Sequence, residues 1–177
     1  LYKMESGSEN RLWEPNRNAD VEKLLMNTIG VSQDPDIYTR DIVGSAYGLS
    51  AVYSDFIDFM DGLVVDGTIG GWRTLPYDWR LSPSEVVLRG VERPDGTISY
   101  LNDVPEGELP FMMKEIAELA VSSQNGKVTI VTHSNGGLVV KALLARLEAL
   151  KVSGESDLLD KIDRVIMVAA PQLGTPS

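Results

Sequence analysis

The hydrophobic pattern is strongest near the end of the chain, where two apolar runs flank a longer apolar segment. Residues 127–131 and 164–170 are short, nearly continuous apolar stretches, which are typical of buried strands in a parallel sheet. The residues that follow Ser134 are mostly apolar up to about Leu150 and predict a helix. Strand, helix and strand in this order predict two parallel strands that are joined by a right-handed crossover.

Upstream, the spacing of apolar residues and of Gly, Pro, Asp and Ser predicts shorter elements between loops. Helices are expected at 20–27, at 50–62 with Ser50 as N-cap, at 110–122 and at 157–163. Short strands are expected near 42–43 and within 70–76. A Pro-Asp-Gly turn at 94–96, between β-prone runs at 86–88 and 97–101, predicts a hairpin. Residues 1–18 are expected to be irregular because they are polar and carry a proline.

Length and composition are those of one globular domain that spans residues 1–177, large enough to bury a core. The parallel strand pair predicts an α/β fold, in which helices flank a mostly parallel sheet. The stretch 84–108 interrupts the alternation of strands and helices. It is therefore a candidate lid or excursion over a substrate site.

Charge and residue content exclude several classes of function. The net charge of −10 argues against a nucleic-acid partner, because binding to phosphates rests on Lys and Arg. The chain has no cysteine, so disulfides and thiolate metal sites are excluded, and no spacing of other ligands indicates a metal or a cofactor. No run approaches the ~20 apolar residues of a membrane span, and no signal-like segment is expected. Secreted and cytoplasmic locations are left equally open.

The residues between the first strand and the long helix carry the strongest candidate chemistry. They read Thr132-His-Ser-Asn-Gly136, which is close to the G-x-S-x-G pattern of a nucleophile elbow, with Thr132 in place of the first glycine. Such a turn presents its serine beside the positive end of a helix, so Ser134 is predicted to attack an acyl carbon. The backbone N–H of Asn135 would then donate to the developing oxyanion. The structural alternative is a serine that only caps the helix.

His133 is the only histidine of the chain, and it lies next to the candidate nucleophile. Adjacent side chains at a strand end point to opposite sides, so the imidazole is not expected to reach the hydroxyl of Ser134. We expect His133 to be packed and hydrogen-bonded beside the elbow. The base that serine catalysis requires must then come from elsewhere.

A second candidate segment is Tyr77-Asp78-Trp79-Arg80, which follows a predicted strand. Its structural interpretation is an Asp78–Arg80 ion pair that locks a loop, with Trp79 packed beneath it. Its functional interpretation is one wall of a pocket for an acyl chain. The sequence leaves both interpretations open.

Three motifs occur in one order along the chain: residues 75–80 (LPYDWR), 131–137 (VTHSNGG) and 168–177 (VAAPQLGTPS). Together they resemble the lecithin:cholesterol acyltransferase-like family of lipases, phospholipases and acyltransferases, within the α/β-hydrolase superfamily. The resemblance implies an α/β-hydrolase fold, a Ser-Asp-His triad, no metal and an acyl-ester substrate. By position, Ser134 matches the nucleophile and Asn135 one oxyanion donor.

The same resemblance implies that parts of the site lie outside these residues. The family's second oxyanion donor lies in an upstream Pro-Gly-x-x-Gly-Ser-like loop, and its triad Asp and His lie on later strands. None of these has a counterpart in the chain, which therefore resembles a partial α/β-hydrolase domain that is incomplete at both ends.

Two functions are therefore expected, and a third arrangement is open. The first is a serine-dependent acyl-ester hydrolase or acyltransferase that works through an acyl-enzyme on Ser134. The alternative is a non-catalytic, degenerate hydrolase module that binds lipid or a protein partner. In the third arrangement, flanking sequence or a complementary chain completes the fold. The acyl substrate and the acceptor are not determined by the sequence.

Overall fold

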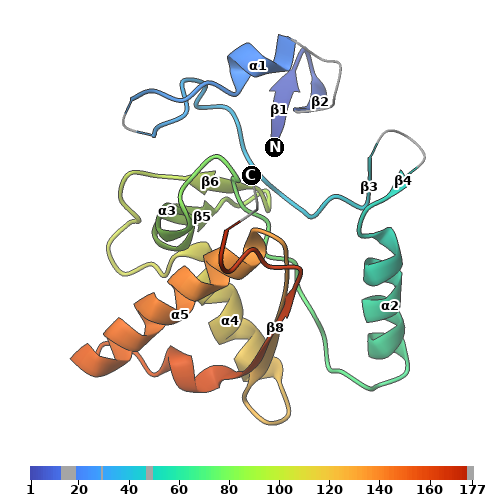
Figure 1. The fold of residues 1–177 in the computed structure, drawn as a ribbon, viewed down its shortest axis with the longest axis vertical. Coiled ribbons are helices and arrows are strands. Elements are labelled where there is room, and N and C mark those ends of the chain that lie inside the picture. The colour runs from blue at the N-terminus through green and yellow to red at the C-terminus, as the bar shows by residue number, and fades with distance from the viewer. Residues whose placement is uncertain (13–18, 29, 47–49, 175–177) are drawn as a thin grey trace.

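The strand–helix–strand unit near the end of the chain is confirmed in a computed structural model, which describes residues 1–12, 19–28, 30–46 and 50–174. Strands β7 (Val128–His133) and β8 (Ile162–Val168) pair in parallel, and helix α5 (Gly136–Ser153) connects them (Figure 1). α5 runs slightly beyond Leu150 and ends at Gly154, whose φ of 77° is readily adopted by glycine. A short 3₁₀ helix, η1 (Leu158–Lys161), leads into β8.

The other strands form antiparallel pairs. These are β1 (Tyr2–Glu5) with β2 (Ser8–Arg11), β3 (Ser45–Ala46) with β4 (Ser50–Ala51), and β5 (Gly90–Glu92) with β6 (Ile98–Tyr100). The remaining helices are α1 (Ala19–Lys23), α2 (Ser54–Val65), α3 (Pro83–Arg89) and α4 (Phe111–Ser122). The mixed α/β class is thus confirmed, and an α/β-hydrolase-like fold is compatible with it. The expected mostly parallel sheet is present, in the described part, only as the pair β7–β8.

The core lies between α3, α4, α5 and the parallel strand pair. Its least exposed side chains are Val86, Val87, Ile98, Met113, Leu143 and Leu147. α4 confirms the predicted helix 110–122, with Pro110 at its N-cap. α2 and the N-terminal elements β1, β2 and α1 lie outside this core, and Figure 1 shows α2 standing to one side of it. The candidate elbow is therefore built on the best-packed part of the chain.

Two helices upstream differ from their predicted bounds. α2 begins at Ser54 instead of residue 50, because Ser50 lies in β4 and the N–H groups of residues 52–54 all donate to the carbonyl of Gly44. It also continues through Gly62 to Val65. α1 ends at Lys23 instead of residue 27. After it, the N–H of Asn27 donates to the carbonyl of Val31 and closes a turn.

Four predicted short elements were wrong, displaced or shortened. No strand is found at 42–43 or at 70–76, because neither segment has a neighbouring strand with which to pair. The β-prone run 86–88 lies inside α3, which a capping box between Ser82 and Glu85 initiates. The predicted hairpin around 94–96 is confirmed, with β5 as its first strand. The predicted helix 157–163 is reduced to η1, because β8 already begins at Ile162.

The ends of the chain and the candidate lid also differ in part from expectation. The described part of the N-terminal segment contains the β1–β2 hairpin, so it is not irregular, and residues 13–18 lie outside the described residues. The segment 84–108 contains most of α3 and the β5–β6 hairpin, and it contributes Val86, Val87 and Ile98 to the core. Whether it covers a substrate site stays a prediction. No helix in the described part is long and apolar enough to span a membrane.

Candidate functional site

The predicted strand–serine–helix turn is present at the end of β7. β7 ends at His133, α5 begins at Gly136, and Ser134 adopts a φ of 51°, a left-handed conformation that costs energy for a non-glycine residue. The backbone N–H of Ser134 donates to the carbonyl of Val168 on β8 at 2.9 Å. The turn is therefore fixed to the neighbouring strand, and its sharp geometry is that of a nucleophile elbow.

The hydroxyl of Ser134 is presented to solvent. The residue is exposed, and its side chain makes no hydrogen bond within the described part of the chain. A serine that acted only as an N-cap would accept a bond from an N–H of the first helical turn. Here Asn135 occupies the N-cap position of α5, and its side chain does not cap the helix either. Ser134 therefore does not cap α5 in the described structure, and its role as a nucleophile stays a prediction.

Gly137 explains why the helix can start so close to the strand pair. A Cβ at Gly137 would overlap the Cβ of Ala170, well inside contact distance, whereas a Cβ at Gly136 would lie 3.5 Å from the Cβ of Thr132, which is ordinary contact. A residue without a side chain is therefore required at position 137, where the helix starts against the strand pair. Thr132 lies beneath both glycines, and a Cβ at either position would meet its side chain only at ordinary contact distance.

Asn135 directly follows Ser134 and lies at the start of α5. Its backbone N–H is at the N-terminus of α5, and within the described residues it donates to no acceptor. The free N–H groups at a helix start and the helix dipole both favour negative charge at this end. The position suits a developing oxyanion beside Ser134, and the role of Asn135 stays a prediction.

His133 is hydrogen-bonded beside the elbow, as predicted, but it is exposed and not packed. Its Nδ1 lies 2.7 Å from the hydroxyl of Tyr53, and the two rings meet edge to face with centroids 5.6 Å apart. In the described part of the chain the imidazole makes no hydrogen bond to Ser134. Tyr53 was not predicted as a site residue, because 80 positions separate it from His133 and no local pattern links them.

The expected ion pair between Asp78 and Arg80 is present and buried. The Nη2 of Arg80 donates to Oδ2 of Asp78 at 2.6 Å, its Nε donates to Oδ1 at 3.0 Å, and the two side chains are 5% and 8% exposed respectively. The Nη1 of Arg80 also donates to the carbonyl of Leu24 and the hydroxyl of Ser32. The pair therefore locks this loop, and Arg80 ties it to the segment that follows α1.

The two aromatic residues of this loop behave differently. Trp79 is 44% exposed, so the expectation that it packs beneath the loop was wrong. Tyr77 is half-buried, and its hydroxyl accepts a hydrogen bond from the side-chain amide of Asn135 at 3.4 Å. Burial raises the pKa of Tyr77. The loop thus reaches the elbow through Tyr77, and its role as a pocket wall stays a prediction.

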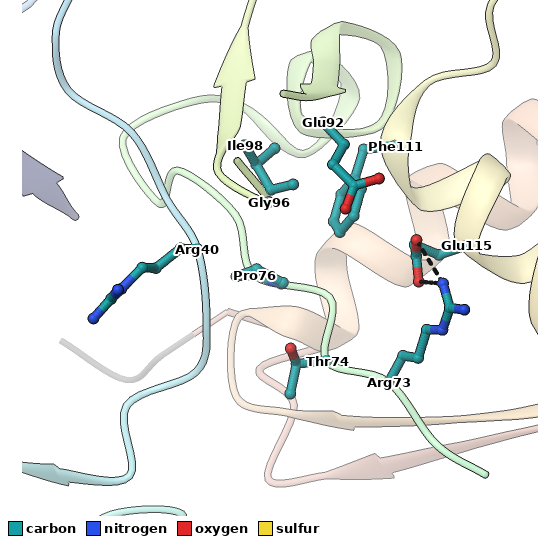
Figure 2. Close-up of a pocket in the computed structure, with 9 residues that line it drawn as sticks. All are labelled: Arg40, Arg73, Thr74, Pro76, Glu92, Gly96, Ile98, Phe111 and Glu115. Carbon is teal, nitrogen blue, oxygen red and sulfur yellow. Dashed lines mark hydrogen bonds and ion pairs between the residues drawn. The ribbon is translucent and has the colours of Figure 1, made fainter. Parts of the chain in front are cut away.

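Two cavities in the described part of the chain lie apart from the elbow. One cavity of about 290 Å³ is lined by residues that include Arg40, Arg73 and Glu115, and by none of residues 132–137. Figure 2 shows Arg73 directed at Glu115, with which it forms an ion pair of 2.9 Å, while Arg40 points away from the other residues. The two cations therefore do not converge on a common ligand. No group of three acidic or histidine residues in the described part could hold a metal ion.

Comparison with known families gives this geometry its context. The family model of lecithin:cholesterol acyltransferase matches residues 46–177, which includes α2, the loop 77–80 and the whole β7–α5–β8 unit. The chain belongs to this family. Family membership indicates an acyltransferase or lipase-like activity in general terms. No curated protein and no solved structure matches the chain. The motif at 168–177, which contributed to the resemblance noted from the sequence, ends in residues 175–177. These three lie outside the described residues.

Proposed function

We propose that the chain carries the nucleophile of a serine-dependent acyl-ester hydrolase or acyltransferase of the lipase and phospholipase type. The observation that supports this most directly is the exposed Ser134 with a φ of 51° between a parallel strand and the start of α5. The same turn lies inside the segment that matches the lecithin:cholesterol acyltransferase family. A lipid or another acyl ester is the expected substrate.

The proposed reaction proceeds through an acyl-enzyme. The Oγ of Ser134 attacks the acyl carbon while a base takes its proton, and the carbonyl oxygen becomes an oxyanion that accepts a hydrogen bond from Asn135 N–H. The bond to the leaving alcohol then breaks, the alcohol takes up the proton, and the acyl group stays on Ser134. Water or an acceptor alcohol attacks this ester, which releases the acid or the new ester and regenerates the serine.

The base of this reaction is proposed to lie outside the 177 residues. His133 is the only histidine, and its Nδ1 contacts Tyr53 instead of Ser134. The outer face of the parallel pair exposes Val131, Ile166 and Val168, although parallel sheets are normally covered on both faces. Flanking sequence or a complementary chain that covers this face would supply the Asp and His of a triad.

The same two observations also favour a second candidate, a non-catalytic module that binds lipid or a protein partner. Without a histidine base, a serine elbow loses most of its catalytic power and keeps only the contribution of its oxyanion donors and of binding. The exposed apolar face of β7 and β8 would then be a binding surface. The two candidates differ in whether any ester turnover depends on Ser134.

Hydrolysis of p-nitrophenyl esters with short and medium acyl chains tests the proposal. Two proteins are compared, the 177-residue chain and the same chain with the residues that flank it in its gene, each with a Ser134→Ala variant. We expect turnover in the longer protein and a loss of at least about 10³-fold in kcat on substitution. If the Ser134→Ala variant keeps its ester turnover, the assignment of Ser134 as nucleophile is contradicted. No serine-dependent turnover in either protein would favour the binding module.

A further inference from the structure

The two residues beside Ser134 are each hydrogen-bonded to a tyrosine from a distant part of the chain. On one side, the hydroxyl of Tyr53 lies 2.7 Å from Nδ1 of His133. On the other side, the hydroxyl of Tyr77 accepts from the amide of Asn135 at 3.4 Å. The tyrosines are 80 and 58 positions away from their partners, so only the tertiary fold brings them to the elbow.

These contacts act on the three residues of the turn that the core does not cover. His133, Ser134 and Asn135 are all exposed, so no surrounding core fixes their side chains. The backbone of the turn has a left-handed serine, a conformation that persists only when neighbouring contacts enforce it. A hydroxyl bonded to each neighbour restricts rotation on both sides of the serine.

The two tyrosines are themselves held in different ways. Tyr77 is half-buried and directly precedes Asp78, whose buried pair with Arg80 locks the loop. Tyr53 directly precedes α2. Its N–H donates to the carbonyl of Gly44, and the carbonyl of Tyr53 accepts from the N–H of Ile57. One anchor therefore comes from the core side of the molecule and the other from the helix that stands outside the core.

We propose that Tyr53 and Tyr77 are positioning residues for Ser134, which act through His133 and Asn135 and do not touch the reacting atoms. Tyr53 fixes the ring orientation and the tautomer of His133, because a hydroxyl that donates to Nδ1 leaves the proton on Nε2. Tyr77 holds the side chain of Asn135 and keeps its backbone N–H directed at the oxyanion position. This inference rests on the proposed role of Ser134 as nucleophile.

Three tyrosine-to-phenylalanine variants test the inference in the protein with its flanking residues. Tyr53→Phe and Tyr77→Phe each remove one hydroxyl and keep the ring, and the matched control Tyr38→Phe removes a hydroxyl that donates to Glu9 at 2.7 Å, away from the elbow. We expect kcat for p-nitrophenyl esters to fall about tenfold or more in the first two variants, with KM unchanged, because misplacement of a reacting group lowers the rate of the bound complex. Tyr38→Phe is expected to keep the wild-type kcat.

Either of two results would overturn the inference. One is a wild-type kcat in both Tyr53→Phe and Tyr77→Phe, and the other is an equal loss of kcat in Tyr38→Phe, which would indicate a general effect of lost stability. The thermal midpoint of each variant is measured alongside, so that a fall in kcat at an unchanged midpoint separates positioning from unfolding.

A spectroscopic readout separates this inference from the proposed function. Because the 177-residue chain has one histidine, the ¹⁵N NMR spectrum of its imidazole contains the signals of His133 alone. We expect one predominant tautomer in the wild type and a mixture in Tyr53→Phe, and a shifted backbone amide signal of Asn135 in Tyr77→Phe. If Ser134→Ala keeps full activity, the proposed function fails. The NMR signals alone then test whether the two tyrosines position His133 and Asn135. Spectra identical to wild type in both variants would then reject the positioning role.

Discussion

α5 and α2 are both helices with many apolar residues, but only one of them is part of the core. Six of the 18 residues of α5 are buried, and none of the 12 residues of α2 is. α5 packs against α3, η1 and β7, whereas α2 lies to one side of the core (Figure 1). Its contacts with the rest of the chain include the edge of Phe56 against Trp72 and the bond from Trp72 to Asp61.

The difference shows what a hydrophobic pattern can and cannot specify. In both segments the spacing of apolar residues predicts a helix, and a helix forms. Whether the apolar side is covered depends on which other elements lie opposite it. The elbow is built at the N-terminus of the covered helix, so its geometry inherits the rigidity of the core, while the contact of Tyr53 depends on the uncovered helix.

The largest expected effect on stability comes from truncating one buried side chain in the covered helix α5. Leu143 in α5 is 1% exposed, so Leu143→Ala should lower the free energy of unfolding by about 2–5 kcal/mol. The matched change in the uncovered helix is Val65→Ala, at a position 89% exposed, which should stay within about 0.5 kcal/mol of wild type. Urea denaturation measures both. Equal losses in the two variants would show that α2 is covered in solution.

A smaller effect is expected where α5 passes the parallel strands. Gly137→Ala should destabilise the chain by about 1–3 kcal/mol, because the new Cβ would overlap that of Ala170. Gly136→Ala is the control, since its Cβ would meet Thr132 at an ordinary 3.5 Å, and it should be tolerated. The thermal midpoints of the two variants measure this difference. The close approach is refuted if both variants melt alike.

The smallest effect concerns helix starts, which also differ between the covered and uncovered parts. α3 begins with a capping box between Ser82 and Glu85, whereas α2 has no side-chain cap. Ser82→Ala should cost about 1 kcal/mol at neutral pH, and Ser54→Ala at the start of α2 should stay within about 0.5 kcal/mol. Both are measured by urea denaturation.

The cost of Ser82→Ala should also depend on pH. The hydroxyl and the backbone N–H of Ser82 lower the pKa of Glu85 below its ordinary 4.5. A lowered folded-state pKa adds stability above the unfolded pKa, and this stability is lost as the pH falls through the folded value. The difference between wild type and Ser82→Ala should therefore shrink below about pH 4.5. A difference that stays constant down to pH 3 would contradict this role of Glu85.

Much of the fold near the elbow could be predicted because its signals are local. The strands 127–131 and 164–170, the helix between them and the turn at Ser134 follow from apolar runs and two glycines, and the structure confirms them within a few residues. The predicted strands at 42–43 and 70–76 failed, because a strand exists only where a neighbour offers hydrogen bonds. The run 86–88 became a helix because the capping box at Ser82 outweighed its β-propensity.

The sequence by itself determined the family, the strand–serine–helix turn and the exclusion of cysteine chemistry, since each depends on residue identity at short range. Only the tertiary structure decided that Tyr53 contacts His133, that Tyr77 reaches Asn135, that Trp79 is exposed and that α2 is uncovered. The two contacts join residues far apart in the chain, and the two exposures depend on which distant elements lie opposite. Their contact energies depend on how helices and strands pack, which no local pattern of residues encodes.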